Sequence, residues 1–226
     1  MTLRHPRPVS SVGDALPLDA ARSLTVIKPD WWIRERAEND GMIWPFTPTL
    51  VRAVNLDRDG QPDRPVISYG LSSYGYDIRL SPFDFRIFRH IPGTVVNPKK
   101  FSATNVEKAE LHHDEYGDYF ILPAHSYGLG VAIERLEVPE NITVRCIGKS
   151  TYARAGIIAN LTPAEAGWRG HLTLEFSNAS SADTRIYANE GVVQLLFFEG
   201  EPCEISYATR QGKYQDQKEA VTLPKV

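Results

Sequence analysis

The sequence predicts a mainly β fold: a sandwich, jelly roll or distorted barrel with a few short helices. The chain has 226 residues, and its 16 prolines and 16 glycines separate short segments rich in β-branched and aromatic residues. A parallel α/β sheet would need repeated long helical crossovers, and the pattern offers none. At this length the chain forms one sizeable core or two small ones.

One short helix is predicted near the start of the chain. Asp30 is placed to cap it, residues 31–39 would form it, and Gly41 would end it. Ile33 and Ala37 are four positions apart, so they share one face of this helix.

The rest of the chain is predicted to consist of strands and turns. Between 171 and 177 apolar and polar residues alternate, which places Glu175 on the face away from the hydrophobic layer. The segment 192–198 is apolar except for Gln194, a pattern typical of a strand covered on both faces. The amide of Gln194 would then need partners, either a ligand or neighbouring backbone. Other short strands are expected at 66–69, 76–80, 83–88, 119–122 and 127–133.

Composition excludes several classes of function. A formal net charge of −3 argues against a general nucleic-acid binder. No apolar run approaches the ~20 residues of a membrane helix, and residues 1–24 lack the apolar centre of a signal peptide. Cys146 and Cys203 form no CxxC pair, so a disulfide framework is not expected and a cytoplasmic location is the default.

The segment 148–156 carries groups suited to an anionic ligand. Lys149, Ser150, Thr151 and Arg154 surround a predicted helix start, with Ser150 as its N-cap. Free backbone N–H groups at such a start favour an anion. Taken alone, the same segment also fits a capped surface helix with solvated charges.

Five separated motifs occur in the order typical of one family. They lie at 72–80 (SSYGYDIRL), 148–156 (GKSTYARAG), 167–175 (GWRGHLTLE), 189–194 (NEGVVQ) and 212–217 (GKYQDQ). With these motifs the chain resembles the dCTP deaminases of the trimeric dUTPase superfamily, over roughly residues 30–226.

This resemblance implies a dUTPase-like, jelly-roll subunit that forms a homotrimer with active sites between subunits. It also implies deamination of dCTP to dUTP and ammonia without zinc, Mg²⁺ bound with the triphosphate, and dTTP as a possible feedback inhibitor. The expected organisation is an N-terminal arm at 1–29 and a deaminase domain at 30–226. The domain would end in a C-terminal lid at about 207–226.

The resemblance also assigns roles to individual residues. Glu175 matches the catalytic glutamate, Arg154 the arginine beside it, and Ser150 the serine of the same motif. Lys149, Ser150 and Thr151 fall where the family holds phosphates. The positions that close over sugar and phosphates are matched by Gln194, Tyr207, Lys213 and Gln217. The chain departs from the family at Glu165-Ala166-Gly167, where many members have Asp-Pro-Gly, and at Glu219, where glycine is common.

A single strand carboxylate suits this chemistry. Deamination at C4 of cytosine needs a water attack, a proton delivered to N3 and a proton for the departing amine, and Glu175 would take the first proton and return it. Partial burial of Glu175 would make it a better base, whereas a close Arg154 would lower its pKa while orienting it.

Other interpretations remain open at this stage. A dUTPase, or a bifunctional deaminase and diphosphatase, would use Glu165 near the phosphates. His113-Asp114-Glu115 matches the H-x-E motif of zinc deaminases. These enzymes also need a P-C-x-x-C motif, and here Ser206 stands where its second cysteine would be, after Pro202-Cys203. A catalytically dead nucleotide-binding regulator is a further possibility.

The individual site residues also have ordinary structural interpretations. Glu175 and Arg154 fit an ion pair, and Tyr207, Lys213 and Gln217 fit a solvated tail. A cupin-like metal-binding protein would use His112, His113, Glu115 and His125.

Overall fold

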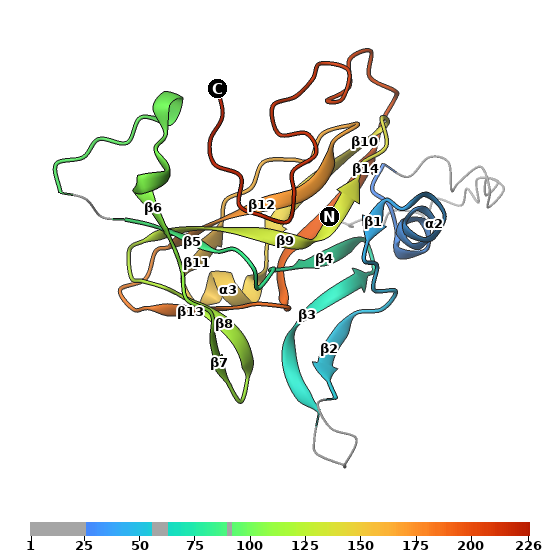
Figure 1. The fold of residues 1–226 in the computed structure, drawn as a ribbon. Helices are drawn as coiled ribbons and strands as arrows, with labels where there is room; N and C mark the ends of the chain where they lie inside the picture. The colour runs from blue at the N-terminus through green and yellow to red at the C-terminus, as the bar shows by residue number, and fades with distance from the viewer. Residues whose placement is uncertain (1–25, 56–62, 90–91) are drawn as a thin grey trace, which may run out of the picture.

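The computed structural model describes residues 26–55, 63–89 and 92–226, which form three antiparallel sheets with short helices at their edges (Figure 1). The predicted mainly β class with a few short helices is confirmed. None of the helices in the described ranges has the length and apolar content needed to cross a membrane.

The predicted N-terminal arm lies mostly outside the described residues, which begin at 26. Its last residues are part of the fold. Ile27 forms an antiparallel bridge with Phe198, and the buried Lys28 makes a salt bridge with Glu199.

Helix α2 (Asp30–Asp40) is the predicted first helix. Gly41 ends it in the left-handed conformation with φ 68°, and Ile33 and Ala37 are both buried, as their spacing predicts. The prediction that Asp30 caps the helix is wrong by one residue, because Asp30 is itself helical. Its carboxylate lies in the first turn, where it complements the helix dipole.

The largest sheet has six strands, with the two longest at its centre. Each strand is antiparallel to its neighbours, although most neighbours in the sheet are not consecutive in the chain. Its order is β11 (Ile157–Ala159), β12 (Arg169–Asn178), β9 (Tyr127–Glu137), β5 (Arg86–Phe88) and β6 (Val106–Lys108), with β1 (Ile43–Trp44) also paired to β9.

Two further sheets complete the described fold. The five-stranded sheet runs β10 (Ile142–Gly148), β14 (Gly191–Glu199), β4 (Gly75–Arg79), β3 (Arg64–Ser72) and β2 (Val51–Val54). The three-stranded sheet runs β13 (Thr184–Tyr187), β8 (Gly117–Leu122) and β7 (His112–Asp114). The remaining short helices are α3 (Ser150–Arg154), η1 (Pro98–Lys100) and η2 (Ala103–Asn105).

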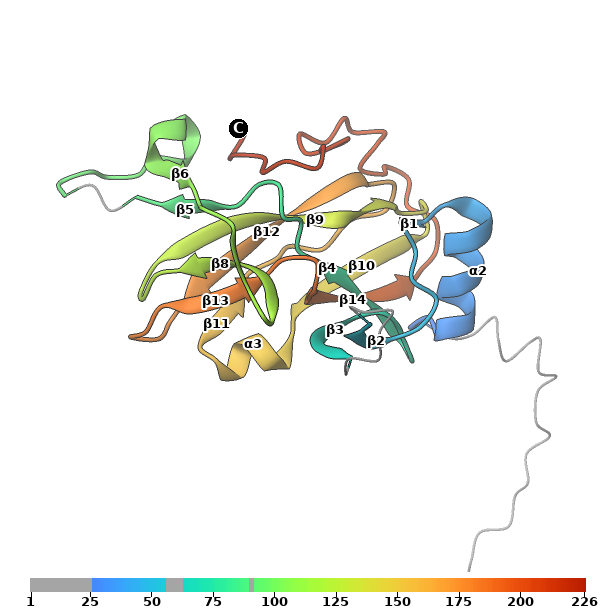
Figure 2. The ribbon, with the colours of Figure 1, turned by 60° about the horizontal axis from the view of Figure 1, so that its bottom comes forward.

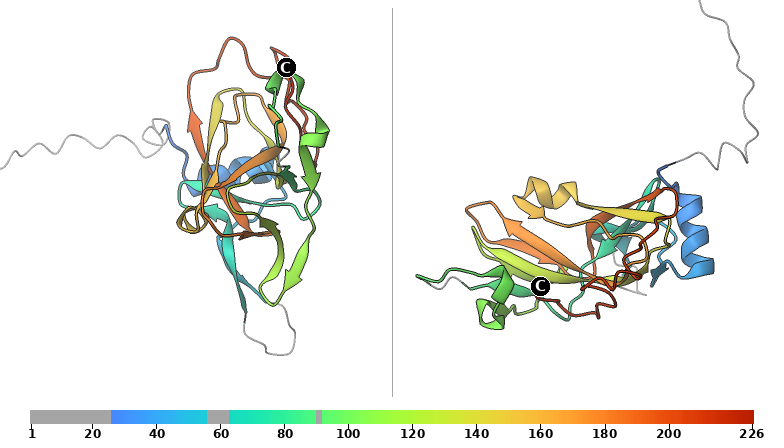
Figure 3. Two further views of the ribbon diagram at one scale, coloured as in Figure 1. Left: turned by 90° about the vertical axis from the view of Figure 1, so that its left-hand side faces the viewer. Right: turned by 90° about the horizontal axis from the view of Figure 1, so that it is seen from above.

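The hydrophobic core lies between these sheets, which face one another in layers (Figures 2 and 3). Phe85 stacks on Phe120 and Phe176 with ring centroids 4.9 and 5.9 Å apart, joining β12 to β8. Ile78 and Leu195 close the core from β4 and β14. Burying such large apolar side chains is the main source of stability in a fold of this kind.

Two predicted strands differ in detail from the observed ones. The strand expected at 83–88 begins only at Arg86, because the Ser81 hydroxyl accepts a hydrogen bond from the Phe83 N–H and holds a turn there. The expectation that 192–198 is covered on both faces is wrong beyond its first residues. From Gln194 onward, buried residues alternate with half-buried ones, so only one face of β14 packs into the core.

The C-terminal segment after β14 contains no helix or strand in the described structure. It folds back over the outer face of β12 and β9, on the opposite side of the molecule from α3 (Figures 1 and 2). This return path places the tail next to the strand that carries Glu175.

Candidate active site

Glu175 lies on β12 near the centre of the six-stranded sheet, opposite Leu129 of β9. Its neighbours Leu174 and Phe176 are buried in the core, and the alternation turns Glu175 to the outer face, as predicted. Glu175 is half-buried, and this burial raises the pKa of its carboxyl. Within the described residues no salt bridge joins it to a basic side chain, so the ordinary ion-pair interpretation is not supported.

A cavity of about 900 Å³ opens over Glu175. Strands β9 and β12 form one wall, the turn that contains Glu165 and Trp168 forms another, and the C-terminal tail covers the cavity. Tyr127 lines it from β9, and burial, followed by the charge of Glu175, raises the pKa of Tyr127 to about 12. The cavity therefore combines a partly desolvated carboxylate with aromatic and polar walls, which is typical of a small-molecule site.

Three predicted residues of the tail reach this cavity with Glu175: Tyr207, Lys213 and Gln217. Lys213 is exposed, and its Nζ donates a hydrogen bond to the backbone oxygen of Lys225 at 2.6 Å. The solvated-tail interpretation is not supported for Tyr207 and Gln217, which are half-buried.

Hydrogen bonds fix the path of the tail over the sheet. The Trp168 indole donates to the backbone oxygen of Tyr214 at 2.9 Å, and the Tyr214 N–H donates to the Tyr207 hydroxyl at 3.0 Å. Gly212 packs directly against the Tyr207 ring, where an added Cβ would come within 2.1 Å of a ring carbon. Only glycine fits this contact, so Gly212 allows the tail to pack against Tyr207 and cover the cavity.

The other predicted residues lie elsewhere in the chain. Ser150, Thr151 and Arg154 are exposed on α3, and none of them lines the cavity of Glu175. The prediction that Ser150 caps α3 is wrong, because the five-residue helix begins at Ser150 and Lys149 is the capping residue. Within the described residues neither Ser150 nor Arg154 makes a side-chain hydrogen bond or salt bridge.

Lys149 faces the interior of the five-stranded sheet instead of solvent. Its Nζ donates to the backbone oxygen and hydroxyl of Ser68 at 2.9 and 3.0 Å, and it makes a salt bridge with Asp77. Burial raises the pKa of Asp77, while Lys149 and more weakly the nearby Gln194 amide pull it down. Gln194 lies opposite Asp77 in the β14–β4 register, yet Oδ1 of Asp77 has no hydrogen-bond partner among the described residues.

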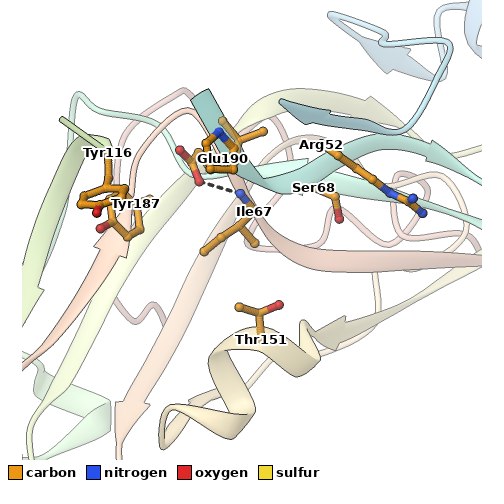
Figure 4. Close-up of a pocket in the computed structure, with 9 residues that line it drawn as sticks. Arg52, Ile67, Ser68, Tyr116, Thr151, Tyr187 and Glu190 are labelled. Carbon is orange, nitrogen blue, oxygen red and sulfur yellow. Dashed lines mark hydrogen bonds between the residues drawn. The ribbon is translucent and has the colours of Figure 1, made fainter. Parts of the chain in front are cut away.

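Thr151 and Ser68 line a second cavity of about 470 Å³ between β3 and α3 (Figure 4). Glu190 borders it and accepts a hydrogen bond from the Ile67 N–H at 2.7 Å. A single chain thus divides the predicted site residues between two places. Glu175 and the tail share one cavity, whereas the residues around α3 are outside it.

The metal-binding alternatives gain no support from the fold. Across residues 26–55, 63–89 and 92–226, no group of three or more histidine, cysteine, aspartate or glutamate side chains is arranged to hold a metal ion. His113 instead pairs with Asp118 at 2.8 Å. The four residues His112, His113, Glu115 and His125 therefore do not assemble a cupin-like centre.

Several site residues were not predicted from the sequence. Thr173 shares the outward face with Glu175, so the same alternation could have indicated it. Tyr127 could not be found in this way, since its place beside Glu175 depends on the pairing of β9 with β12. Asp77 and Ser68 are distant in sequence from Lys149, and only the fold brings them together.

Comparison with known proteins identifies the class. Residues 27–200 match the family model described as dCTP deaminase-like, and the chain belongs to this family. It is 50% identical over 201 residues to the dCTP deaminase of Azoarcus sp. (strain BH72), covering 88% of this chain and 99% of that one. It is 51% identical over 200 residues to the dCTP deaminase of Paraburkholderia phymatum, covering 88% and 98%.

A solved structure is also similar. The 2'-deoxycytidine 5'-triphosphate deaminase from Agrobacterium tumefaciens aligns with a TM-score of 0.46 and 17% identity, over 78% of this chain and 48% of that one.

Proposed function

We propose that this protein deaminates dCTP to dUTP and ammonia in the cytoplasm, without zinc, at sites shared between the subunits of a homotrimer. The observation that carries the proposal is Glu175 itself. It is a half-buried carboxylate with a raised pKa in a cavity covered by the tail, in a chain of the dCTP deaminase-like family.

The proposed reaction uses Glu175 as a proton shuttle. Glu175 accepts a proton from water as the oxygen bonds to C4 of cytosine, and it returns that proton to N3. The C4–N bond then breaks, the amine leaves as ammonia with the second proton of the water, and the C4 carbonyl of dUTP forms. Burial assists because a desolvated carboxylate holds a proton more readily.

The assembly is inferred from what one chain leaves incomplete. Ser150 and Arg154 are exposed and outside the cavity of Glu175, so α3 of a second copy is proposed to bring them to it. There Arg154 would orient the carboxylate and offset charge, and Ser150 would bind the substrate. Large exposed apolar side chains, including Trp44, Phe83 and Val95, also fit a surface covered by partner subunits.

The triphosphate is proposed to lie under the tail, held by Lys213 and Gln217, with Thr151 and Lys149 contributing from the second copy. Mg²⁺ enters as part of the substrate, bound by the phosphate oxygens that this hard cation prefers. Gln194 and Tyr207 are proposed to position the sugar. Inhibition by dTTP stays a prediction, tested by adding dTTP to the same assay.

Incubation with dCTP and Mg²⁺, with products separated by ion-exchange chromatography, tests the function. We expect dUTP and ammonia from the wild-type chain and none from Glu175→Gln, which keeps the shape but cannot accept the proton. Activity lost on zinc removal and restored only by zinc would contradict the proposal.

A second activity, dUTP diphosphatase, is favoured by one observation: Glu165 borders the same cavity. Both of its carboxylate oxygens contact Arg210, however, which reduces its freedom to activate water. Release of dUMP when dUTP itself is supplied as the substrate, lost in Glu165→Gln and kept in Glu175→Gln, would establish this activity.

A further inference from the structure

Thr173 makes two hydrogen bonds that connect the catalytic strand to the tail. It lies two residues before Glu175 on the same face of β12, and both line the cavity with Gln217. The Thr173 hydroxyl accepts a hydrogen bond from the Thr222 N–H at 3.1 Å and donates one to Oε1 of Gln217 at 2.9 Å. One hydroxyl group therefore contacts both ends of the segment 217–222.

The direction of these bonds follows from the chemistry of the groups. A backbone N–H can only donate, so the Thr173 oxygen accepts from Thr222 and keeps its own hydrogen free to donate. Among the described residues that hydrogen has no acceptor other than the Gln217 side chain. It is satisfied only when the amide of Gln217 turns its oxygen toward Thr173, because the amide nitrogen is a donor.

We call the two hydrogen bonds of the Thr173 hydroxyl, to Thr222 and to Gln217, the relay. Because the backbone of Gln217 is already fixed by other contacts, the relay decides only the orientation of its side-chain amide. The His171 N–H donates to the Gln217 backbone oxygen at 2.9 Å, and Gln217 forms a parallel bridge with Gly170. With Oε1 held by Thr173, the two N–H donors of Nε2 remain, and the described residues provide no acceptor for them. Donors without partners at the edge of a cavity suit a ligand rich in acceptor oxygens.

We propose that Thr173 is a positioning residue that turns the amide donors of Gln217 toward the phosphate or sugar oxygens of the nucleotide. The inference rests on the proposed function and adds to it a hydroxyl that acts through Gln217. Without the hydroxyl the amide is free to flip, and its oxygen would then face an anionic ligand. The same loss releases Thr222 and loosens the end of the tail.

The test compares Thr173→Val, which keeps the shape but removes the hydroxyl, with Thr173→Ser, which keeps the hydroxyl. For Thr173→Val we expect KM for dCTP to rise about tenfold, the loss of roughly one hydrogen bond to a charged group, with kcat within about threefold of wild type. Thr173→Ser should restore KM to within about twofold. Thr143→Val, the same change at an exposed position on β10, is the matched control and should leave KM unaltered.

A double-mutant cycle separates positioning from a second, independent contact. If Thr173 acts mainly through Gln217, Thr173→Val added to Gln217→Ala should raise KM by no more than about twofold beyond Gln217→Ala alone, the remainder that the lost Thr222 contact accounts for. Multiplied losses, on the order of a hundredfold together, would overturn the proposal. So would an unchanged KM in Thr173→Val, or an equal loss in Thr173→Ser.

A measurement without nucleotide keeps this inference distinct from the proposed function. Amide hydrogen exchange should show Thr222 protected in the wild type and in Thr173→Ser, and unprotected in Thr173→Val. If the wild type releases no ammonia from dCTP, the proposed function fails, and dCTP binding by calorimetry replaces KM in the cycle. Equal protection of Thr222 in all three proteins would overturn the relay whatever the enzyme does.

Discussion

At the scale of single residues, a fully buried and a half-buried glutamate show how differently this fold treats a carboxylate. Glu134 is fully buried but lies against Arg79, with Oε1 2.7 Å from the guanidinium. Glu175 is half-buried and has no such cation within the described structure. Burial raises the pKa of both, but only Glu175 faces a cavity. A carboxylate kept without a partner costs stability and gains basicity, which fits a catalytic role.

This cost predicts a pH-dependent effect of Glu175→Gln on stability. The folded state raises the pKa of Glu175 above its unfolded value, so it binds the proton more tightly than the unfolded state does. Wild-type stability therefore falls as the pH rises from the unfolded-state pKa of Glu175 to its higher folded-state pKa. The loss of stability is complete above the folded-state pKa and absent below the unfolded-state pKa. We expect Glu175→Gln to melt at a higher temperature than wild type at pH 8, with the difference shrinking toward pH 4.

Thermal melts of the wild type and Glu175→Gln between about pH 4 and pH 8 check the prediction. Glu201→Gln, a change at an exposed carboxylate, controls for the loss of a surface charge. A Glu175→Gln protein that is less stable than wild type at pH 8 would show that the carboxylate has a stabilising partner.

A second prediction concerns Lys149, which the resemblance places at the phosphates and the fold places against Asp77. Removing its charge leaves Asp77 buried without a cation, so Lys149→Met should lower the free energy of unfolding by about 3–5 kcal/mol. Adding Asp77→Asn should recover part of this loss, because it removes the unpaired charge. Urea unfolding of the three proteins measures both effects. Unchanged stability in Lys149→Met would contradict a stabilising role for the pair with Asp77, and weakened dCTP binding would support the phosphate contact proposed for Lys149.

At the scale of elements, local patterns predicted what depends on neighbouring residues. The alternation around Leu174 and Phe176 gave the correct face of β12, and the spacing of Ile33 and Ala37 gave the buried face of α2. The tail was less accessible to sequence reasoning, because contacts such as that between Gln217 and Gly170 join residues far apart in the chain. The apolar composition of residues 192–198 predicts that β14 is buried, but it does not determine whether one or both faces of the strand are covered.

The tail offers a third prediction, at Gly212. A methyl group there would clash with the Tyr207 ring, so Gly212→Ala should displace the segment that covers Glu175. We expect KM for dCTP to rise at least tenfold and amide exchange to increase across 212–222. The melting temperature should stay close to that of wild type, since the tail contributes little to the core.

The matched control for this prediction is Gly200→Ala. A Cβ at Gly200 would meet nothing within 4 Å, so this variant should behave like wild type. An unchanged KM in Gly212→Ala would mean that the tail does not need this contact to cover the site.

At the scale of the whole molecule, the chain separates the two groups of residues that the proposed chemistry needs together. Glu175, Lys213 and Gln217 share one cavity, while Ser150 and Arg154 are exposed on α3 across the molecule (Figure 2). The sequence motifs gave the identities of these residues, but not their separation within one chain. That separation is what a site shared between identical subunits requires.

A fourth prediction is the oligomeric state. If α3 completes the cavity of a second copy, the active form is a homotrimer with three equivalent sites. Light scattering coupled to an activity assay should find dCTP deamination in the trimer peak. Full activity in a monomer would show that one chain builds a complete site.

The most direct test of the shared site mixes two inactive proteins. Glu175→Gln lacks the base and Arg154→Ala lacks the arginine, so each alone should release little ammonia. Co-refolded in equal amounts, they should regain about a quarter of wild-type activity, because random assembly pairs an intact Glu175 with an intact Arg154 in one site of four. Mixing Glu175→Gln with Gln217→Ala, whose residues share one cavity, should give no more than the sum of the separate preparations. No recovery in the first mixture, with mixed trimers demonstrated by mass spectrometry, would contradict the account.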